Sequence, residues 1–200
     1  MKAFHIVGPA PLCTNTFLLV TDAGHAVAID PAADASLYEQ ALEQTGAKLT
    51  HILCTHGHYD HVGAVKQLKE KWGCKVYLDP ADAKGNSSLP MTESDSGYVD
   101  GGEIKVDELT FKTWHTPGHT LGSWVILCGD MFFTGDTLFH GSIGRTDLPG
   151  GSMMQMEESL QKLLELPVPD KARVLPGHEA FSTMADEKRH NYYLREFMEE

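Results

Sequence analysis

The chain of 200 residues carries 16 Lys and Arg residues against 28 Asp and Glu residues, a formal net charge of −12. A surface this acidic repels phosphate backbones and anionic lipid, so neither a nucleic-acid nor a membrane-surface partner is expected. With 42% hydrophobic and 22% charged residues, the composition is that of a globular protein with a substantial core.

No signal-peptide core and no membrane-spanning apolar run is visible, which predicts a cytoplasmic protein. The cysteines form no C-x-x-C pair and have apolar neighbours; they are Cys13, Cys54, Cys74 and Cys128. This pattern favours small buried thiols in a reducing compartment over a disulfide scaffold or a thiolate metal site.

Three β-rich runs open the chain, at residues 3–7, 16–21 and 26–30, and turn residues between them predict an antiparallel meander. A helix is predicted over residues 34–44, with Asp34 as its N-terminal cap and Gly46 at its end. Residues 51–54 predict a buried strand, residues 60–72 a second amphipathic helix, and residues 75–78 another strand. This order indicates βαβ crossover units.

A polar, glycine-containing stretch at residues 86–102 predicts a long surface loop before a second β-rich block at 104–106, 109–114, 123–127 and 131–134. Gly129 and Asp130 are expected to form the hairpin turn between the last two strands. A helix at 153–166, a strand at 173–175 and a terminal helix at 184–198 follow. Because no repeat or linker divides the chain, we expect one domain over residues 1–200, with two facing sheets and helices outside them.

The segment from Thr55 to His61 carries the strongest chemical signal. His56 and His58 are two residues apart in a loop, so both side chains can bind one ion. Asp60 and His61 start the next helix and diverge, so they can face a second ion nearby. Imidazole and carboxylate ligands suit Zn²⁺, and also iron or manganese.

Three later segments each place one further ligand-type residue just after a strand, where loops gather into sites. They contain His119 in Thr-Pro-Gly-His-Thr, Asp136 in Thr-Gly-Asp-Thr, and His178 in Leu-Pro-Gly-His-Glu. Each segment alone is a weak signal, because a turn histidine is the commoner interpretation. Their combination and order are much more specific.

The succession H-x-H-x-D-H, G-H, G-D, G-H resembles the signature of the metallo-β-lactamase superfamily. Residues 15–20 and the Asp30-Pro31 turn are similar to that family's opening strands. Residues 135–147 and the ending at 187–191 look like the hydroxyacylglutathione hydrolase, or glyoxalase II-like, branch. The resemblance implies an α/β fold with an αββα four-layer sandwich of two mixed sheets.

The resemblance also implies the ligand assignments. His56, His58 and His119 would hold a first metal, Asp60, His61 and His178 a second, and Asp136 would bridge them. Two divalent ions, with zinc as the first choice, would lower the pKa of a bridging water to about 7, and the resulting hydroxide would attack a carbonyl. Asp60 would be catalytic by orienting this nucleophile.

A small-molecule thioester is the favoured substrate, because a thiol leaves as a thiolate with a pKa near ~8.5 and needs little proton donation. Arg145 is expected either to bind a substrate carboxylate or to pair with Asp147, and Tyr59 either to touch substrate or to pack. The basic helical domain with which longer glyoxalase II enzymes grip glutathione has no counterpart at the end of this chain. Another small thioester or ester is therefore kept open.

Two other functions remain as alternatives. A persulfide dioxygenase of similar fold would use a single iron at His56, His119 and Asp136. A non-catalytic metal-binding scaffold would need no open position for water, and Asp60 argues against it. The complete second set of ligands favours hydrolysis.

Overall fold

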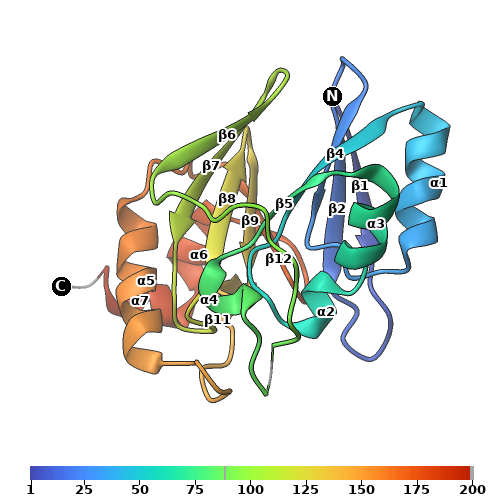
Figure 1. Ribbon diagram of the computed structural model, residues 1–200. Helices are drawn as coiled ribbons and strands as arrows, with labels where there is room; N and C mark the ends of the chain where they lie inside the picture. The colour runs from blue at the N-terminus through green and yellow to red at the C-terminus, as the bar shows by residue number, and fades with distance from the viewer. Residues whose placement is uncertain (88, 199–200) are drawn as a thin grey trace.

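The computed structural model, which describes residues 1–87 and 89–198, consists of two mixed β-sheets packed face to face (Figure 1). The first sheet, in spatial order, contains β1 (Lys2–Val7), β2 (Asn15–Val20), β3 (His25–Ile29), β4 (Lys48–Leu53) and β5 (Lys75–Tyr77). The second contains β13 (Ser182–Thr183), β12 (Arg173–Pro176), β9 (Met131–Gly135), β8 (Trp124–Cys128), β7 (Leu109–His115) and β6 (Gly102–Val106).

Helices cover the outer face of each sheet (Figure 1). Beside the first sheet lie α1 (Ala35–Thr45) and α3 (Val65–Trp72), and beside the second lie α5 (Met153–Glu165) and α7 (Tyr192–Glu196). The remaining helices are α2 (Tyr59–Val62), α4 (Pro80–Ala83) and α6 (Met184–His190). The predicted αββα sandwich is confirmed.

Three hydrophobic layers separate the four layers of secondary structure, because successive side chains of a strand point to opposite faces. In β2, Phe17 and Leu19 enter the core between the sheets, whereas Leu18 packs under the helices of the first sheet. In β8, Ile126 faces the core between the sheets and Val125 faces α5. The inner strands of both sheets are therefore buried on two sides, which accounts for the nearly continuous apolar runs of β2, β8 and β9.

Several local predictions are confirmed. The Asp34 side chain accepts a hydrogen bond from Ser36 N at the start of α1, and Gly46 ends the helix in the left-handed conformation. Gly129, at a φ of 63°, turns the chain between β8 and β9. The loop predicted over residues 86–102 ends one residue earlier, because Gly102 already belongs to β6; its described residues make one β-bridge, between Tyr77 and Ser96, and residue 88 lies outside the described part.

The single helix predicted over residues 60–72 is wrong, because the structure has α2 and α3 in its place. The Ala64 N–H donates to the Pro31 carbonyl at 2.8 Å instead of continuing the helical ladder. A Cβ on Gly63 would also lie 3.2 Å from Ala32 O. The close approach of the 31–32 turn therefore divides the helix and sets the direction of α2, which carries two predicted ligands.

The terminal helix predicted over 184–198 is likewise divided, at Asn191, into α6 and α7. The Asn191 side-chain oxygen caps α7, and its amide donates to the carbonyls of Phe139 and Ser142. Buried Glu187 accepts from Gly141 N at 2.9 Å. These bonds hold an unpredicted hairpin formed by β10 (Leu138–Phe139) and β11 (Ser142–Ile143).

Other differences are smaller. β4 begins at Lys48 rather than at residue 51, and α4 and β13 were not predicted. All four cysteines are free, but only Cys54, Cys74 and Cys128 are buried, so the expectation of a buried thiol is wrong for Cys13. Within residues 1–87 and 89–198, no helix is long and apolar enough to cross a bilayer.

Tyr38 links α1 to the first sheet and makes stability sensitive to alkali. Its buried hydroxyl lies 2.5 Å from Thr16 Oγ1 and accepts from Ala33 N. Burial raises the pKa of Tyr38 to about 12. The folded state thus prefers the neutral phenol, and its contribution to stability is full below pH 10 and lost as the pH rises from 10 to 12.

We expect the free energy of unfolding to fall by about 2–3 kcal/mol across that window because of this group. Urea unfolding of the wild type and of Tyr38→Phe, from pH 8 to 12, measures this fall in the free energy of unfolding. The variant lacks the phenol, so the difference between the two proteins should be constant below pH 9 and should change above pH 10. A constant difference throughout would contradict the assignment.

Candidate metal centre

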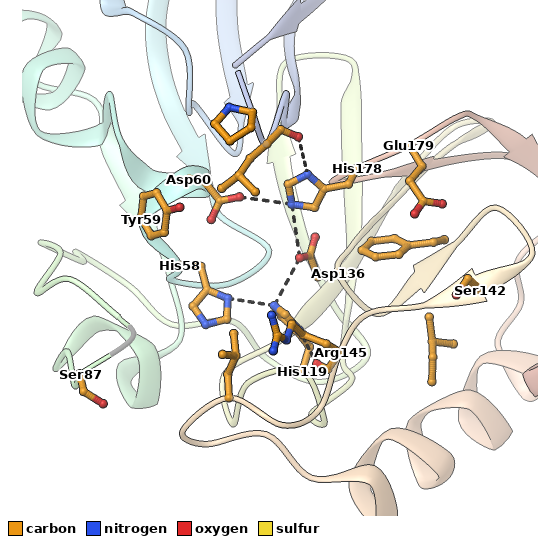
Figure 2. A pocket seen from close by; sticks show the side chains of 15 residues that line it. His58, Tyr59, Asp60, Ser87, His119, Asp136, Ser142, Arg145, His178 and Glu179 are labelled. Carbon is orange, nitrogen blue, oxygen red and sulfur yellow. Dashed lines mark hydrogen bonds and ion pairs between the residues drawn. The ribbon is translucent and has the colours of Figure 1, made fainter. Parts of the chain in front are cut away.

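The seven predicted metal ligands come together at one edge of the two sheets. His56 and His58 lie in the loop after β4, and Asp60 and His61 lie in α2. The other three follow strands of the second sheet: His119 comes after β7, Asp136 directly after β9, and His178 after β12. Figure 2 shows His58, Asp60, His119 and His178 arranged around Asp136. The strand ends that the sequence indicated therefore form one cluster.

Within the cluster, the side chains form groups whose ligand atoms lie within 4.8 Å of one another. One group is His56, His58 and His119; another is Asp60, His61 and His178. A third joins His56, His61 and Asp136. The cluster is thus suited to binding two metal ions.

The Asp136 carboxylate lies between the two main groups. Its Oδ2 is 3.3 Å from His119 Nε2 and 3.5 Å from His178 Nε2, and its Oδ1 is 3.4 Å from His61 Nε2. His178 Nε2 also lies 3.2 Å from Asp60 Oδ2. This position is the one expected of a bridging ligand.

Unpaired buried atoms support the fit of metal ions to this cluster. His56 Nε2 and Asp136 Oδ1 are buried and have no hydrogen-bond partner within the described part of the chain. Buried polar atoms are normally paired, because leaving them unpaired costs free energy. A bound cation would satisfy such atoms.

The protonation states of His56, His58 and Asp136 suit metal binding directly. Burial lowers the pKa of His58 to about 4 and that of His56 well below its ordinary value, so both rings are neutral at pH 7. Burial works to raise the pKa of Asp136, but His61 and His178 hold it well below its usual range. Neutral imidazoles and an ionised carboxylate are the ligand forms of these side chains. In His61 and His178 burial lowers the pKa, but the Asp136 carboxylate outweighs it and raises the pKa of His178 to about 10 and that of His61 well above its ordinary value, so metal binding must displace a proton from each of these two rings.

Hydrogen bonds behind the cluster orient three of the imidazoles. The Nδ1 atoms of His119 and His178 lie 2.7 Å from the Arg145 carbonyl and 3.0 Å from the Leu12 carbonyl, respectively. His61 Nδ1 lies 3.0 Å from Asp30 Oδ2. Donation from each Nδ1 leaves Nε2 free to face the site, which is the usual arrangement for metal-binding histidines.

Asp30 is a site residue that the sequence analysis missed. It is buried, has a φ of 45°, and also accepts from the backbone and hydroxyl of Thr55 at 2.6 Å each. The only local signal is an aspartate at the end of an apolar strand, which also fits a turn. Its contact with His61, 31 positions away, is visible only in the fold.

A cavity of about 740 Å³ opens above the cluster. Five of the candidate ligands form part of its wall, namely His58, Asp60, His119, Asp136 and His178. Its apolar lining comprises Pro11, Leu12, Phe139, Ile143 and Leu148, and polar lining residues include Tyr59, Ser87, Ser142, Arg145 and Glu179. The site is thus an open one, with room for a small organic molecule next to the ligands.

Both predicted substrate contacts line this cavity. Tyr59 is 63% exposed, and Arg145 is also exposed. The Arg145 guanidinium makes two hydrogen bonds with Asp147, at 2.7 and 2.8 Å, so the ion pair considered from the sequence is present. A role in substrate binding stays a prediction for both residues.

Comparison with known proteins matches residues 10–178 to the metallo-beta-lactamase superfamily profile. The chain belongs to the metallo-beta-lactamase superfamily. With its fold and its His/Asp cluster, it is a metal-dependent hydrolase of this superfamily.

Relatives of known name cover almost the whole chain. Hydroxyacylglutathione hydrolase GloC of Haemophilus influenzae is 34% identical over an alignment of 196 positions that covers 90% of this chain and 92% of GloC. The crystal structure of ETHE1 from Myxococcus xanthus has a TM-score of 0.84 and 32% identity, covering 100% of this chain and 89% of that one. The structure of TTHA1623 in a di-iron-bound form has a TM-score of 0.79 and 34% identity, covering 95% of this chain and 99% of that one.

Proposed function

We propose that this protein is a binuclear thioesterase that hydrolyses small acyl thioesters of the hydroxyacyl-glutathione type or a related type. The observation that carries the proposal is the pair of ligand groups on either side of Asp136, beneath an open cavity. The full-length similarity to a hydroxyacylglutathione hydrolase supports the thioester class.

In this proposal, His56, His58 and His119 would hold one ion, Asp60, His61 and His178 would hold the other, and Asp136 would serve both. Two bound divalent cations supply a water nucleophile at neutral pH and polarise the substrate carbonyl. Zinc fits the ligands, and so do iron and manganese.

Asp60 is proposed to orient the attacking water. Burial acts to raise its pKa, but the hydrogen bond with His178 leaves it below the ordinary value, so the carboxylate is ionised at pH 7. One oxygen, Oδ2, accepts from Thr14 Oγ1 at 3.1 Å. A carboxylate held in this way on the cavity wall can accept a proton from water.

The cavity lining favours a good leaving group. None of the proposed ligands Asp60, Asp136 and His178 on the cavity wall would donate a proton at pH 7. The two carboxylates have lowered pKa values and are ionised, and His178, whose pKa is raised to about 10, would lose its proton on binding a metal. A thiolate with a pKa near ~8.5 leaves without a strong proton donor, whereas an amide nitrogen needs one. The apolar wall formed by Leu12, Phe139 and Ile143 provides a surface for the acyl or thiol portion.

A persulfide dioxygenase is the second candidate, because its single-iron set of His56, His119 and Asp136 lies inside the same cluster. His119 Nε2 and Asp136 Oδ2 are only 3.3 Å apart. The second group, Asp60, His61 and His178, has no role in that reaction, and it favours the thioesterase. The open cavity argues against a purely structural metal site.

The test measures metal content and turnover together. We expect two divalent ions per chain and hydrolysis of S-lactoylglutathione or of short acyl thioesters of N-acetylcysteamine. Chelation should abolish turnover, and added Zn²⁺, Fe²⁺ or Mn²⁺ should restore it. One iron per chain, with oxygen uptake on glutathione persulfide and no thioester hydrolysis, would instead establish the dioxygenase.

A further inference from the structure

Asp82 is a buried carboxylate to which the proposed reaction assigns no role. It lies in the short helix α4, its exposed fraction is 0%, and it does not line the cavity above the metal cluster. An ionisable side chain is rarely buried this completely unless it has partners. Its partners therefore indicate what it does.

Three donors converge on this carboxylate from two separate loops. Oδ2 accepts from Gly57 N at 2.9 Å and from Thr120 Oγ1 at 2.8 Å. Oδ1 accepts from Gly122 N at 3.0 Å. The first donor belongs to the loop after β4 in the first sheet, and the other two belong to the loop between β7 and β8 in the second.

These loops carry all three histidines of one ligand group. Gly57 lies between His56 and His58, and Thr120 directly follows His119. One carboxylate thus joins the two chain segments that carry these histidines. The separation of the two segments determines the distance between His119 Nε2 and His58 Nδ1, which is 2.8 Å in the structure. No such contact joins Asp82 to Asp60, His61 or His178.

Packing around the carboxylate is tight. A Cβ on Gly57 would lie 2.9 Å from Asp82 Cβ, and one on Gly122 would lie 2.7 Å from Asp82 Oδ1. Helix α4 is itself fixed by Asp79, which caps it through Ala81 N and accepts from Trp124 Nε1 at 2.9 Å. Asp82 is therefore held at a defined place between the loops.

We propose that Asp82 is a positioning residue that sets the spacing between His56, His58 and His119, and through it the metal affinity of that ligand group. The inference rests on the binuclear centre of the proposed function but not on the identity of the substrate. Mutating a hydrogen-bonding partner of the ligands typically lowers the metal affinity of a site by about 10–100-fold.

The experiment is a zinc titration of chelator-treated full-length protein against a chromophoric competitor, for the wild type, Asp82→Asn and Asp79→Asn. The Asp79 variant is the matched control, because asparagine keeps a side-chain oxygen that can cap α4 through Ala81 N and alters none of the three hydrogen bonds that Asp82 accepts. We expect Asp82→Asn to weaken one of the two zinc sites at least tenfold. The other site, and both sites of Asp79→Asn, should stay within about threefold of the wild type.

Double variants identify the weakened site. On a His178→Ala background, which leaves the His56, His58 and His119 group, Asp82→Asn should still weaken zinc binding. On a His58→Ala background it should have little further effect. If Asp82→Asn does not fold, Thr120→Val removes one donor and should weaken the same site to a smaller extent.

Equal weakening of both sites, or wild-type affinity at both, would overturn the proposal. This result is separate from the proposed function, which fails if a protein with two bound zinc ions hydrolyses no thioester. The positioning role of Asp82 would survive that failure.

Discussion

Replacing Asp136 with alanine is expected to remove most of the bound metal and to lower kcat/KM at least about a thousandfold. The carboxylate lies within 3.5 Å of His61, His119 and His178, so its loss affects both ligand groups at once. It is also the anion whose negative charge stabilises positive charge on these buried imidazoles. Metal analysis of the purified variant, together with thioester hydrolysis at saturating Zn²⁺, measures both effects.

His115→Ala is the control for that variant. His115 is near the cluster in sequence, but its Nε2 lies 2.9 Å from the Leu121 carbonyl and its ring lies 5.0 Å from that of Trp124, at a tilt of 37°. Metal content should therefore stay at the wild-type value. If Asp136→Ala keeps two metals and full activity, the bridging assignment is wrong; if His115→Ala loses one, a ligand has been misassigned.

The clustering of the candidate ligands could be predicted because each of them is marked locally. Five of these residues adjoin a glycine in a loop after an apolar strand, Asp60 and His61 open the next helix, and the order of all seven resembles a family signature. The strands could be predicted from their apolar runs, and α1 from Asp34 and Gly46. These signals depend on only a few neighbouring residues.

The residues that support the ligands could not be found in this way. Asp30 meets His61 across 31 positions, and Asp82 meets Gly122 across 40. An aspartate next to a proline or in a short helix has a ready explanation as a turn or a cap. Only the packing of the two sheets shows that both carboxylates face the metal loops.

The breaks in the two mispredicted helices have the same origin. Residues 60–72 have a continuous amphipathic pattern, and the interruption comes from the Pro31 carbonyl, which accepts from Ala64 N. Residues 184–198 are interrupted because Asn191 bonds the β10–β11 hairpin instead of continuing the helix. In both cases a tertiary hydrogen bond overrides a helical propensity.

Gly177→Ala is the second substitution with a large expected effect. The reason for this effect also explains why a glycine precedes His178. Gly177 has no left-handed φ, so alanine suits its backbone. A Cβ there would, however, lie 2.5 Å from His61 Cε1 and closer still to Asp136 Oδ1. Both neighbours are buried ligands, so neither can move without disturbing the cluster.

We expect Gly177→Ala to lower kcat/KM about a hundredfold, because displacement by ~1 Å at a catalytic centre has an effect of that order. Overpacking should also lower the free energy of unfolding by about 1–3 kcal/mol. Gly8→Ala is the matched control, since its Cβ would meet nothing nearer than 3.4 Å. Activity, zinc content and urea unfolding of the two variants separate a steric effect on the ligands from a general effect of alanine. Wild-type activity in Gly177→Ala would mean that His61 and Asp136 have room to move, and that the close packing of the cluster does not control its chemistry.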